Sequence, residues 1–230
     1  MTRLVAATVL LACALSAPLH AAESPAKARV QTKESQAAMT PSEALASLKA
    51  GNARFVSGAM KHRDWPAKVV ATASGQFPFA AILACMDSRA PNEIVFDQGI
   101  GDVFGIRVAG NVVNEDELGS LEYAVMVGTK LIVVLGHTEC GAVKGALDDA
   151  KLDNLTGLLA KIRPAAAAAG CSDSKDRACV TRVAEKNVLQ SMKEIRAKSP
   201  YVAKSLDEGK VQLVGAMYDV ATGRVTFLEN

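Results

Sequence analysis

Four short apolar runs, each ended by glycine or polar residues, set the strongest limit on how this chain can fold. They span residues 79–84, 103–108, 131–135 and 211–217. Such continuous apolar runs are typical of strands that are buried on both faces. Stretches with helical spacing lie between them, notably residues 118–125 and 181–198. Strands that alternate with helices predict an α/β fold, in which helices flank a mainly parallel central sheet.

The C-terminal segment predicts a different kind of strand pairing. Residues 218–228 contain Ala221-Thr222-Gly223 between two alternating runs. A short glycine-containing turn between such runs indicates a β-hairpin. We therefore expect an antiparallel hairpin at one edge of the sheet.

The first 22 residues have the layout of a secretory signal peptide. Arg3 is followed by an apolar run and then by small residues. The run is too short to span a membrane comfortably, so we expect cleavage and a periplasmic or secreted mature protein. The alternative is a lipoprotein signal with the lipid on Cys13. Leu11 is not typical before a lipidated cysteine, and apolar sequence continues past Cys13.

The rest of the chain divides into a polar arm, residues 23–38, and a single domain, residues 39–230. In the domain, Thr40-Pro41-Ser42-Glu43 is a capping box that predicts a helix to about Lys49, with an interruption at Gly51-Asn52. The formal charge of +2 falls to +1 without the signal peptide, because only Arg3 is lost. So small a charge argues against a nucleic-acid partner, and no other segment is apolar enough to span a membrane.

Two clusters of reactive side chains directly follow predicted buried strands. The first is Cys85-Met86-Asp87-Ser88-Arg89, and the second is His137-Thr138-Glu139-Cys140. The carboxyl ends of parallel strands share one edge of a sheet, so we expect the clusters to meet. After cleavage only His62 and His137 remain as histidines, which excludes a three-histidine metal site within one chain. Two thiolates and one imidazole are instead the ligands of a catalytic zinc with an open fourth position.

Asp87 and Arg89 have a predicted role beside that zinc. A carboxylate two residues from a ligand can itself bind the metal. A bidentate pair with Arg89 would hold Asp87 back and leave room for water. The alternative is a surface ion pair that contributes almost nothing to stability.

These motifs resemble the zinc site of the beta-class carbonic anhydrases. The resemblance rests on Cys-x-Asp-x-Arg followed by His-x-x-Cys-Gly about fifty residues later, and it extends over most of the mature chain. The other similar segments are Gly51-Asn52-Ala53-Arg54-Phe55, Phe96-Asp97-Gln98-Gly99, Arg107-Val108-Ala109-Gly110-Asn111 and Ser120-Leu121-Glu122-Tyr123-Ala124-Val125. It implies the beta-carbonic anhydrase fold and a homodimer or homotetramer.

The resemblance also implies what each matching residue does. Cys85, His137 and Cys140 would hold one zinc ion per chain, with Asp87 and Arg89 beside it. Gln98 and Tyr123 would lie near the substrate. The implied reaction is the hydration of carbon dioxide to bicarbonate and a proton by a zinc-bound hydroxide, because zinc lowers the pKa of its bound water to about 7. Asp87 is the first candidate to orient that hydroxide, and His62 is a candidate proton shuttle.

Two alternative functions remain open at this point. The same site is used by relatives on carbonyl sulfide or carbon disulfide, and a non-catalytic zinc protein is the other reading. Some members of the class have an inhibitory bicarbonate pocket with a tryptophan where this chain has Ile82. That regulation is not expected here, although Arg107 matches another residue of the pocket. A switch in which Asp87 moves onto zinc at low pH stays open.

Cys171 and Cys179 are the two cysteines of the mature chain that are not assigned to zinc. They flank a polar loop, and in an exported protein they predict a disulfide. The alternative is a pair of free thiols.

Overall fold

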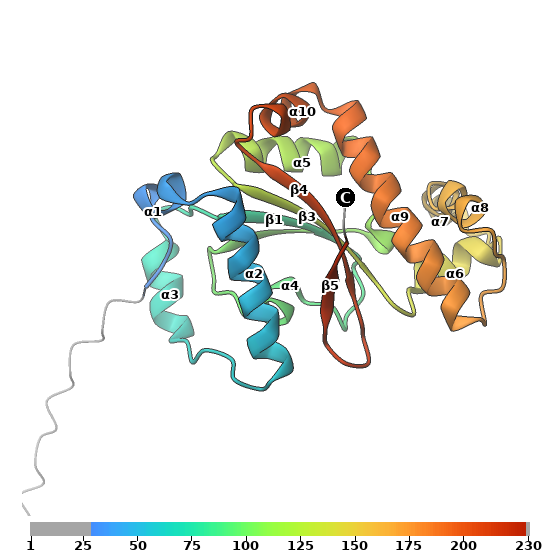
Figure 1. Ribbon diagram of the computed structural model, residues 1–230, viewed down its shortest axis with the longest axis horizontal. Coiled ribbons are helices and arrows are strands. Elements are labelled where there is room, and N and C mark those ends of the chain that lie inside the picture. The colour runs from blue at the N-terminus through green and yellow to red at the C-terminus, as the bar shows by residue number, and fades with distance from the viewer. Residues whose placement is uncertain (1–28, 229–230) are drawn as a thin grey trace, which may run out of the picture.

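The computed structural model describes residues 29–228, which fold around a five-stranded sheet with the strand order β2-β1-β3-β4-β5 (Figure 1). The strands are β1 (Ala80–Ala84), β2 (Val103–Arg107), β3 (Leu131–His137), β4 (Gln212–Tyr218) and β5 (Val225–Phe227). The first four are parallel, and β5 pairs antiparallel with β4 at the edge. The predicted parallel sheet and its C-terminal hairpin are confirmed.

Helices connect the strands and cover the sheet. They are α1 (Lys33–Ala38), α2 (Pro41–Val56), α3 (Trp65–Thr72), α4 (Asn92–Val95), the 3-10 helix η1 (Ala109–Asn111), α5 (Glu115–Met126), α6 (Gly141–Leu147), α7 (Asp153–Ala160), α8 (Arg163–Ala169), α9 (Arg177–Lys198) and α10 (Pro200–Asp207). None of the helices in residues 29–228 combines the length and the apolar character needed to cross a membrane. The predicted signal peptide lies outside the described residues.

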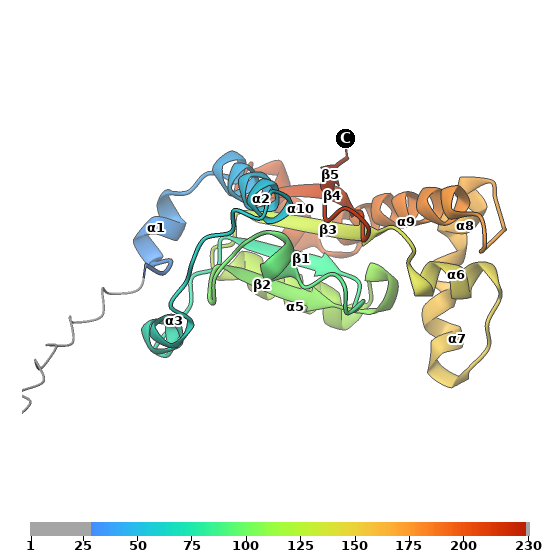
Figure 2. The same cartoon turned by 90° about the horizontal axis from the view of Figure 1, so that it is seen from below.

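Both faces of the sheet are buried, which explains why its strands are continuous apolar runs. In β1, Ala81 and Leu83 belong to one core cluster, which includes residues of α5 and α9. Ala80 and Ile82 belong to the opposite cluster, which includes residues of α2 and α4. Figure 2 shows α2 and α5 on opposite sides of the sheet. The period-two alternation of strand side chains therefore supplies both cores.

The break predicted at Gly51-Asn52 is wrong, because α2 continues without interruption from Pro41 to Val56. Gly51 lies so close to the backbone of Phe96 that a Cβ atom would overlap its carbonyl group. The Asn52 side chain bonds to three backbone groups outside the helix, including the Val95 carbonyl at 3.0 Å. Tertiary contacts thus account for two residues that are unfavourable in an isolated helix.

The polar arm predicted for residues 23–38 also needs a correction in its last part. Residues 33–38 form α1, which begins with a capping box between Thr32 and Ser35. The Gln36 side chain is buried and donates to the Pro78 carbonyl at 2.8 Å. This contact attaches the end of the arm to the domain, while residues 23–28 lie outside the described part of the chain.

A buried carboxylate ties α2 to the loop that precedes β2. Asp97 is fully buried and accepts hydrogen bonds from the side chains of Arg54 and Arg63 and from the Lys61 backbone. Burial alone would raise the pKa of Asp97, but the bonds from Arg63 and Arg54 outweigh it and hold the pKa below its ordinary value. The stabilisation is thus complete above about pH 4 and is lost as the pH falls further.

Replacing Asp97 by asparagine is expected to lower the free energy of unfolding by about 3 kcal/mol at neutral pH, because two arginines lose a buried partner. The loss should shrink in acid, where the wild-type carboxylate also becomes neutral. Urea unfolding at both pH values measures this difference. Asp148→Asn is the control, since Asp148 is exposed. An Asp97→Asn effect that is equal at both pH values would contradict the account.

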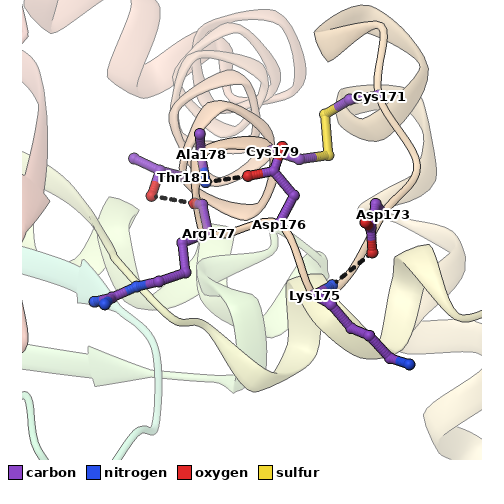
Figure 3. Close-up of a disulfide and its surroundings, with 8 residues drawn as sticks. All are labelled: Cys171, Asp173, Lys175, Asp176, Arg177, Ala178, Cys179 and Thr181. Atoms are coloured by element: carbon purple, nitrogen blue, oxygen red, sulfur yellow. Dashed lines mark hydrogen bonds between the residues drawn. A yellow bond between two sulfur atoms is a disulfide. The ribbon is translucent and has the colours of Figure 1, made fainter.

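The loop before α9 is closed by a disulfide between Cys171 and Cys179 (Figure 3). Cys179 is fully buried in the first turns of α9. Asp176 caps this helix by accepting from the Ala178 backbone N–H at 2.9 Å. The disulfide and the cap together fix where α9 begins.

Removing the disulfide with Cys171→Ala and Cys179→Ala together is expected to lower the free energy of unfolding by about 2–3 kcal/mol, because the unfolded chain loses a closed loop. Urea unfolding of the double variant beside the wild-type chain measures this change. Equal stability of the two proteins would contradict this contribution of the disulfide.

Candidate metal centre

Three buried side chains bring their donor atoms together at the carboxyl edge of the sheet. Ala84, the last residue of β1, pairs with Leu135 of β3. Cys85, directly after β1, and His137, the last residue of β3, therefore lie at the same edge of the sheet. Cys140 follows one turn later, directly before α6. The donor atoms of Cys85, His137 and Cys140 all lie within 4.8 Å of one another.

One nitrogen of the His137 imidazole is hydrogen-bonded, and the other has no partner among residues 29–228. Its Nδ1 lies 2.8 Å from the Thr138 carbonyl oxygen, which only accepts, so Nδ1 carries the proton. Its Nε2 is buried and has no hydrogen-bond partner among residues 29–228. A buried polar atom without a partner calls for an explanation. A metal ligand whose other ring nitrogen donates to a carbonyl meets that requirement.

The two cysteine thiols of the site shift the pKa of each other in opposite directions. A hydrogen bond from Cys140 lowers the pKa of Cys85 to about 4, against the opposing effect of burial. The Gly110 N–H also donates to Cys85 Sγ at 3.3 Å. The same bond and the adjacent thiolate raise the pKa of Cys140, while the Val143 and Ala142 N–H groups at the start of α6 act in the opposite direction. The lowered pKa of Cys85 favours the thiolate form, which is the form that binds metals.

The fit to a metal follows from this donor set. Two cysteine sulfurs and one imidazole nitrogen converge from three buried residues. This combination suits zinc, with a fourth position free for a small molecule.

Asp87 and Arg89 form a bidentate pair beside the three donors. Arg89 donates from Nε to Asp87 Oδ1 at 2.9 Å and from Nη2 to Oδ2 at 2.8 Å. These bonds are the main reason why the pKa of Asp87 lies well below its ordinary value. Asp87 Oδ2 lies 3.8 Å from Nε2 of His137. The carboxylate thus faces the metal centre while both of its oxygens are held by Arg89.

The backbone of the first cluster is clamped from the edge strand. Arg107, the last residue of β2, donates to the Cys85 carbonyl at 3.2 Å and to the Asp87 carbonyl at 2.5 Å. Ile82, which stands at the position of the tryptophan in the bicarbonate pocket, is fully buried in the core. Arg107 therefore has a structural use here that the sequence did not indicate.

The structure does not place the remaining predicted residues beside the three donors within one chain. Gln98 is buried and donates to the Phe96 carbonyl at 2.6 Å. It lines a polar cavity of about 1010 Å³ that also includes the exposed His62. Tyr123 lies on α5, half exposed, with its ring edge-on to Phe104. Gln98, His62 and Tyr123 have no contact with the metal centre among the interactions of residues 29–228.

The sequence did not indicate the roles of two residues of the site, Gly110 and Glu139. Gly110 adopts a positive φ of 68°, which lets η1 turn its N–H toward Cys85. Glu139 lies between His137 and Cys140 with a φ of 56°. For Gly110 a glycine after a strand was a weak signal. For Glu139 the sequence carries no such signal, since its partners Lys144 and Arg177 come later in the chain.

The comparisons with known proteins agree with this site. The sequence model of the carbonic anhydrase family matches residues 80–225. Carbonic anhydrase 2 of Mycobacterium tuberculosis is 36% identical over 200 residues, which cover 83% of this chain and 94% of the relative. Among solved structures, a tetrameric β-carbonic anhydrase of Sordaria macrospora is 26% identical, with a TM-score of 0.66 over 81% of this chain and 95% of the other.

A β-carbonic anhydrase of Aspergillus fumigatus is 30% identical, with a TM-score of 0.64 over 82% of this chain and 90% of that one. The chain belongs to the carbonic anhydrase family, and its structural relatives place it in the beta class.

Proposed function

We propose that this protein catalyses the reversible hydration of carbon dioxide to bicarbonate and a proton at a zinc centre held by Cys85, His137 and Cys140. The observation that carries the proposal is the convergence of two thiols on a buried imidazole nitrogen that has no other partner. Membership in the carbonic anhydrase family supports the reaction. When bound, zinc would supply a water that ionises near neutral pH, and hence a nucleophile for carbon dioxide.

Asp87 and Arg89 would act on the water that attacks carbon dioxide. Asp87 stays ionised, because Arg89 holds its pKa low. Its carboxylate would accept a hydrogen bond from the attacking water and so orient that water toward the substrate. Arg89 takes up both carboxylate oxygens. It would thereby keep Asp87 from occupying the fourth position on the metal.

Stopped-flow measurement of carbon dioxide hydration tests the proposal, with the zinc content of the purified protein determined in parallel. Rapid hydration with about one zinc per chain is the expected result. Consumption of carbonyl sulfide or carbon disulfide, measured on the same preparation, tests the alternative substrates. Zinc at full occupancy without hydration of carbon dioxide would contradict the proposed activity.

We also propose that the mature protein acts in the periplasm or is secreted. The signal peptide expected in residues 1–22 supports export. The Cys171–Cys179 disulfide supports an oxidising compartment. Fractionation of cells that express the full chain, with mass determination of its N-terminus, tests this location. An uncleaved chain in the cytoplasm would contradict it, and a lipid on Cys13 would establish the lipoprotein alternative.

The proposed assembly is a homodimer or a homotetramer. Tyr123 and Met126 leave apolar surface exposed on α5, which packs against the edge strand β2. Exposed apolar side chains that lie near each other favour a protein contact. The Sordaria macrospora relative is described as tetrameric. Light scattering on the eluting protein measures the mass directly, and a monomer at micromolar concentration would contradict the assembly.

A further inference from the structure

Glu139 holds an unusual backbone conformation at the centre of the metal-binding turn. It separates the ligands His137 and Cys140, and its φ is 56°. L-residues rarely adopt this left-handed conformation, and glycine or asparagine is the ordinary choice for it. The reason for a glutamate at this position must therefore lie in the contacts of its side chain.

Each oxygen of the Glu139 carboxylate is held by a different cation. Lys144 of α6 donates to Oε2 at 2.5 Å, and Arg177 of α9 donates to Oε1 at 2.8 Å. The backbone carbonyl of Glu139 accepts from Arg89 Nη2 at 3.3 Å. One residue thus joins the ligand turn, the helices α6 and α9, and the Asp87–Arg89 pair.

The contact with Arg177 comes from the start of α9, close to the disulfide. Arg177 is the first residue of α9, two positions before the disulfide-bonded Cys179. Figure 3 shows its side chain extending away from the disulfide. The same helix supports the other cysteine ligand, because the Asn187 side chain donates to the Gly110 carbonyl at 2.7 Å. Gly110 in turn donates to Cys85.

We propose that Glu139 is a positioning residue, which holds the His137–Cys140 turn in its metal-binding conformation by linking it to Lys144 and to the disulfide-anchored start of α9. The inference rests on the zinc centre proposed above. Arg177 is 76% exposed and Lys144 is 37% exposed, whereas Glu139 is only 21% exposed. The less exposed Lys144 contact carries the larger share, since exposed ion pairs contribute little.

The test compares zinc affinity with the stability of the metal-free protein. Asparagine tolerates a positive φ but is too short to reach both partners, so Glu139→Asn removes the two side-chain contacts without adding backbone strain. Its zinc dissociation constant is expected to rise about tenfold, as for other residues that orient metal ligands. Glu139→Gln, which keeps the length, should fall between this variant and the wild type. Arg177→Gln should weaken zinc binding by only about threefold.

Competition with a chromophoric chelator measures the affinities, and thermal unfolding of each metal-free variant measures stability. The visible spectrum of the cobalt-substituted protein reports the ligand geometry. Arg182→Gln is the matched control, because Arg182 is an exposed arginine on α9 without an ion pair in residues 29–228.

Weaker zinc binding and an altered cobalt spectrum, with an unchanged unfolding temperature of the metal-free Glu139→Asn protein, would support the proposal. Zinc affinity equal to that of the wild type would overturn it. A loss of affinity that only follows a lower unfolding temperature would also overturn it. If the wild-type chain bound no zinc, the proposed metal centre itself would fail, so the two failures are distinguishable.

Discussion

A Cys85→Ser chain is expected to purify with little zinc and to lose carbon dioxide hydration by roughly three orders of magnitude or more, because one of three protein ligands is gone. The serine hydroxyl does not ionise near neutral pH and is a poor ligand beside the two remaining donors. Zinc analysis and stopped-flow hydration, made on the same preparation, measure both effects.

The control for Cys85→Ser is Met86→Leu. Met86 is the next residue along the chain, and its side chain is 63% exposed. This variant should keep its zinc and its activity. Full zinc content and unchanged hydration in Cys85→Ser would contradict the assignment of Cys85 as a ligand.

An Asp87→Asn chain is expected to keep its zinc and to hydrate carbon dioxide about a hundredfold more slowly, because a positioned hydrogen-bond acceptor is lost. Asparagine preserves the shape of the side chain but cannot accept both bonds from Arg89. The expected loss falls mainly on kcat, since Asp87 is not among the three donors that converge at the site. Steady-state hydration kinetics with zinc analysis separate this result from metal loss.

Asp207→Asn is a matched control for Asp87→Asn. Asp207 forms an exposed ion pair with Arg196. It ends α10, which leads into the amino end of β4, whereas the metal centre lies at the carboxyl edge of the sheet (Figure 1). Its loss should leave hydration unchanged. If Asp87→Asn were as active as this control, the pair with Arg89 would be a surface ion pair without a role in the reaction.

The sheet could be predicted from the sequence because strands that are buried on both faces are continuous apolar runs. β1 was expected over residues 79–84 and occupies Ala80–Ala84. β3 was expected to end at residue 135, but it continues to His137. The last two residues belong to the strand, and the polar side chain of His137 concealed where the strand ends.

Helices whose form depends on distant contacts were harder to predict. Gly51 and Asn52 indicate a break when they are considered locally. In the structure Gly51 packs against the Phe96 backbone, and Asn52 donates to the Val95 carbonyl. The helix α1 was missed for the same reason, since its buried Gln36 bonds to Pro78, which is 42 positions away.

The donors of the metal centre could be predicted because residue type and strand-end position are both visible in a sequence. The supporting contacts could not. Glu139 meets Arg177, 38 positions later, and Gly110 meets Asn187, 77 positions later. Gln98 and Tyr123 were expected near the substrate from resemblance alone. In the structure Gln98 lines a separate cavity, and the Tyr123 ring packs against Phe104.

X-ray absorption at the zinc edge of the purified chain is the most direct test of the central claim, which is that Cys85, His137 and Cys140 hold zinc with one position free. The account predicts two sulfur neighbours and two lighter neighbours around each zinc ion, and one sulfur in the Cys85→Ser chain after zinc is added in excess. Four sulfur neighbours, or none, would contradict it.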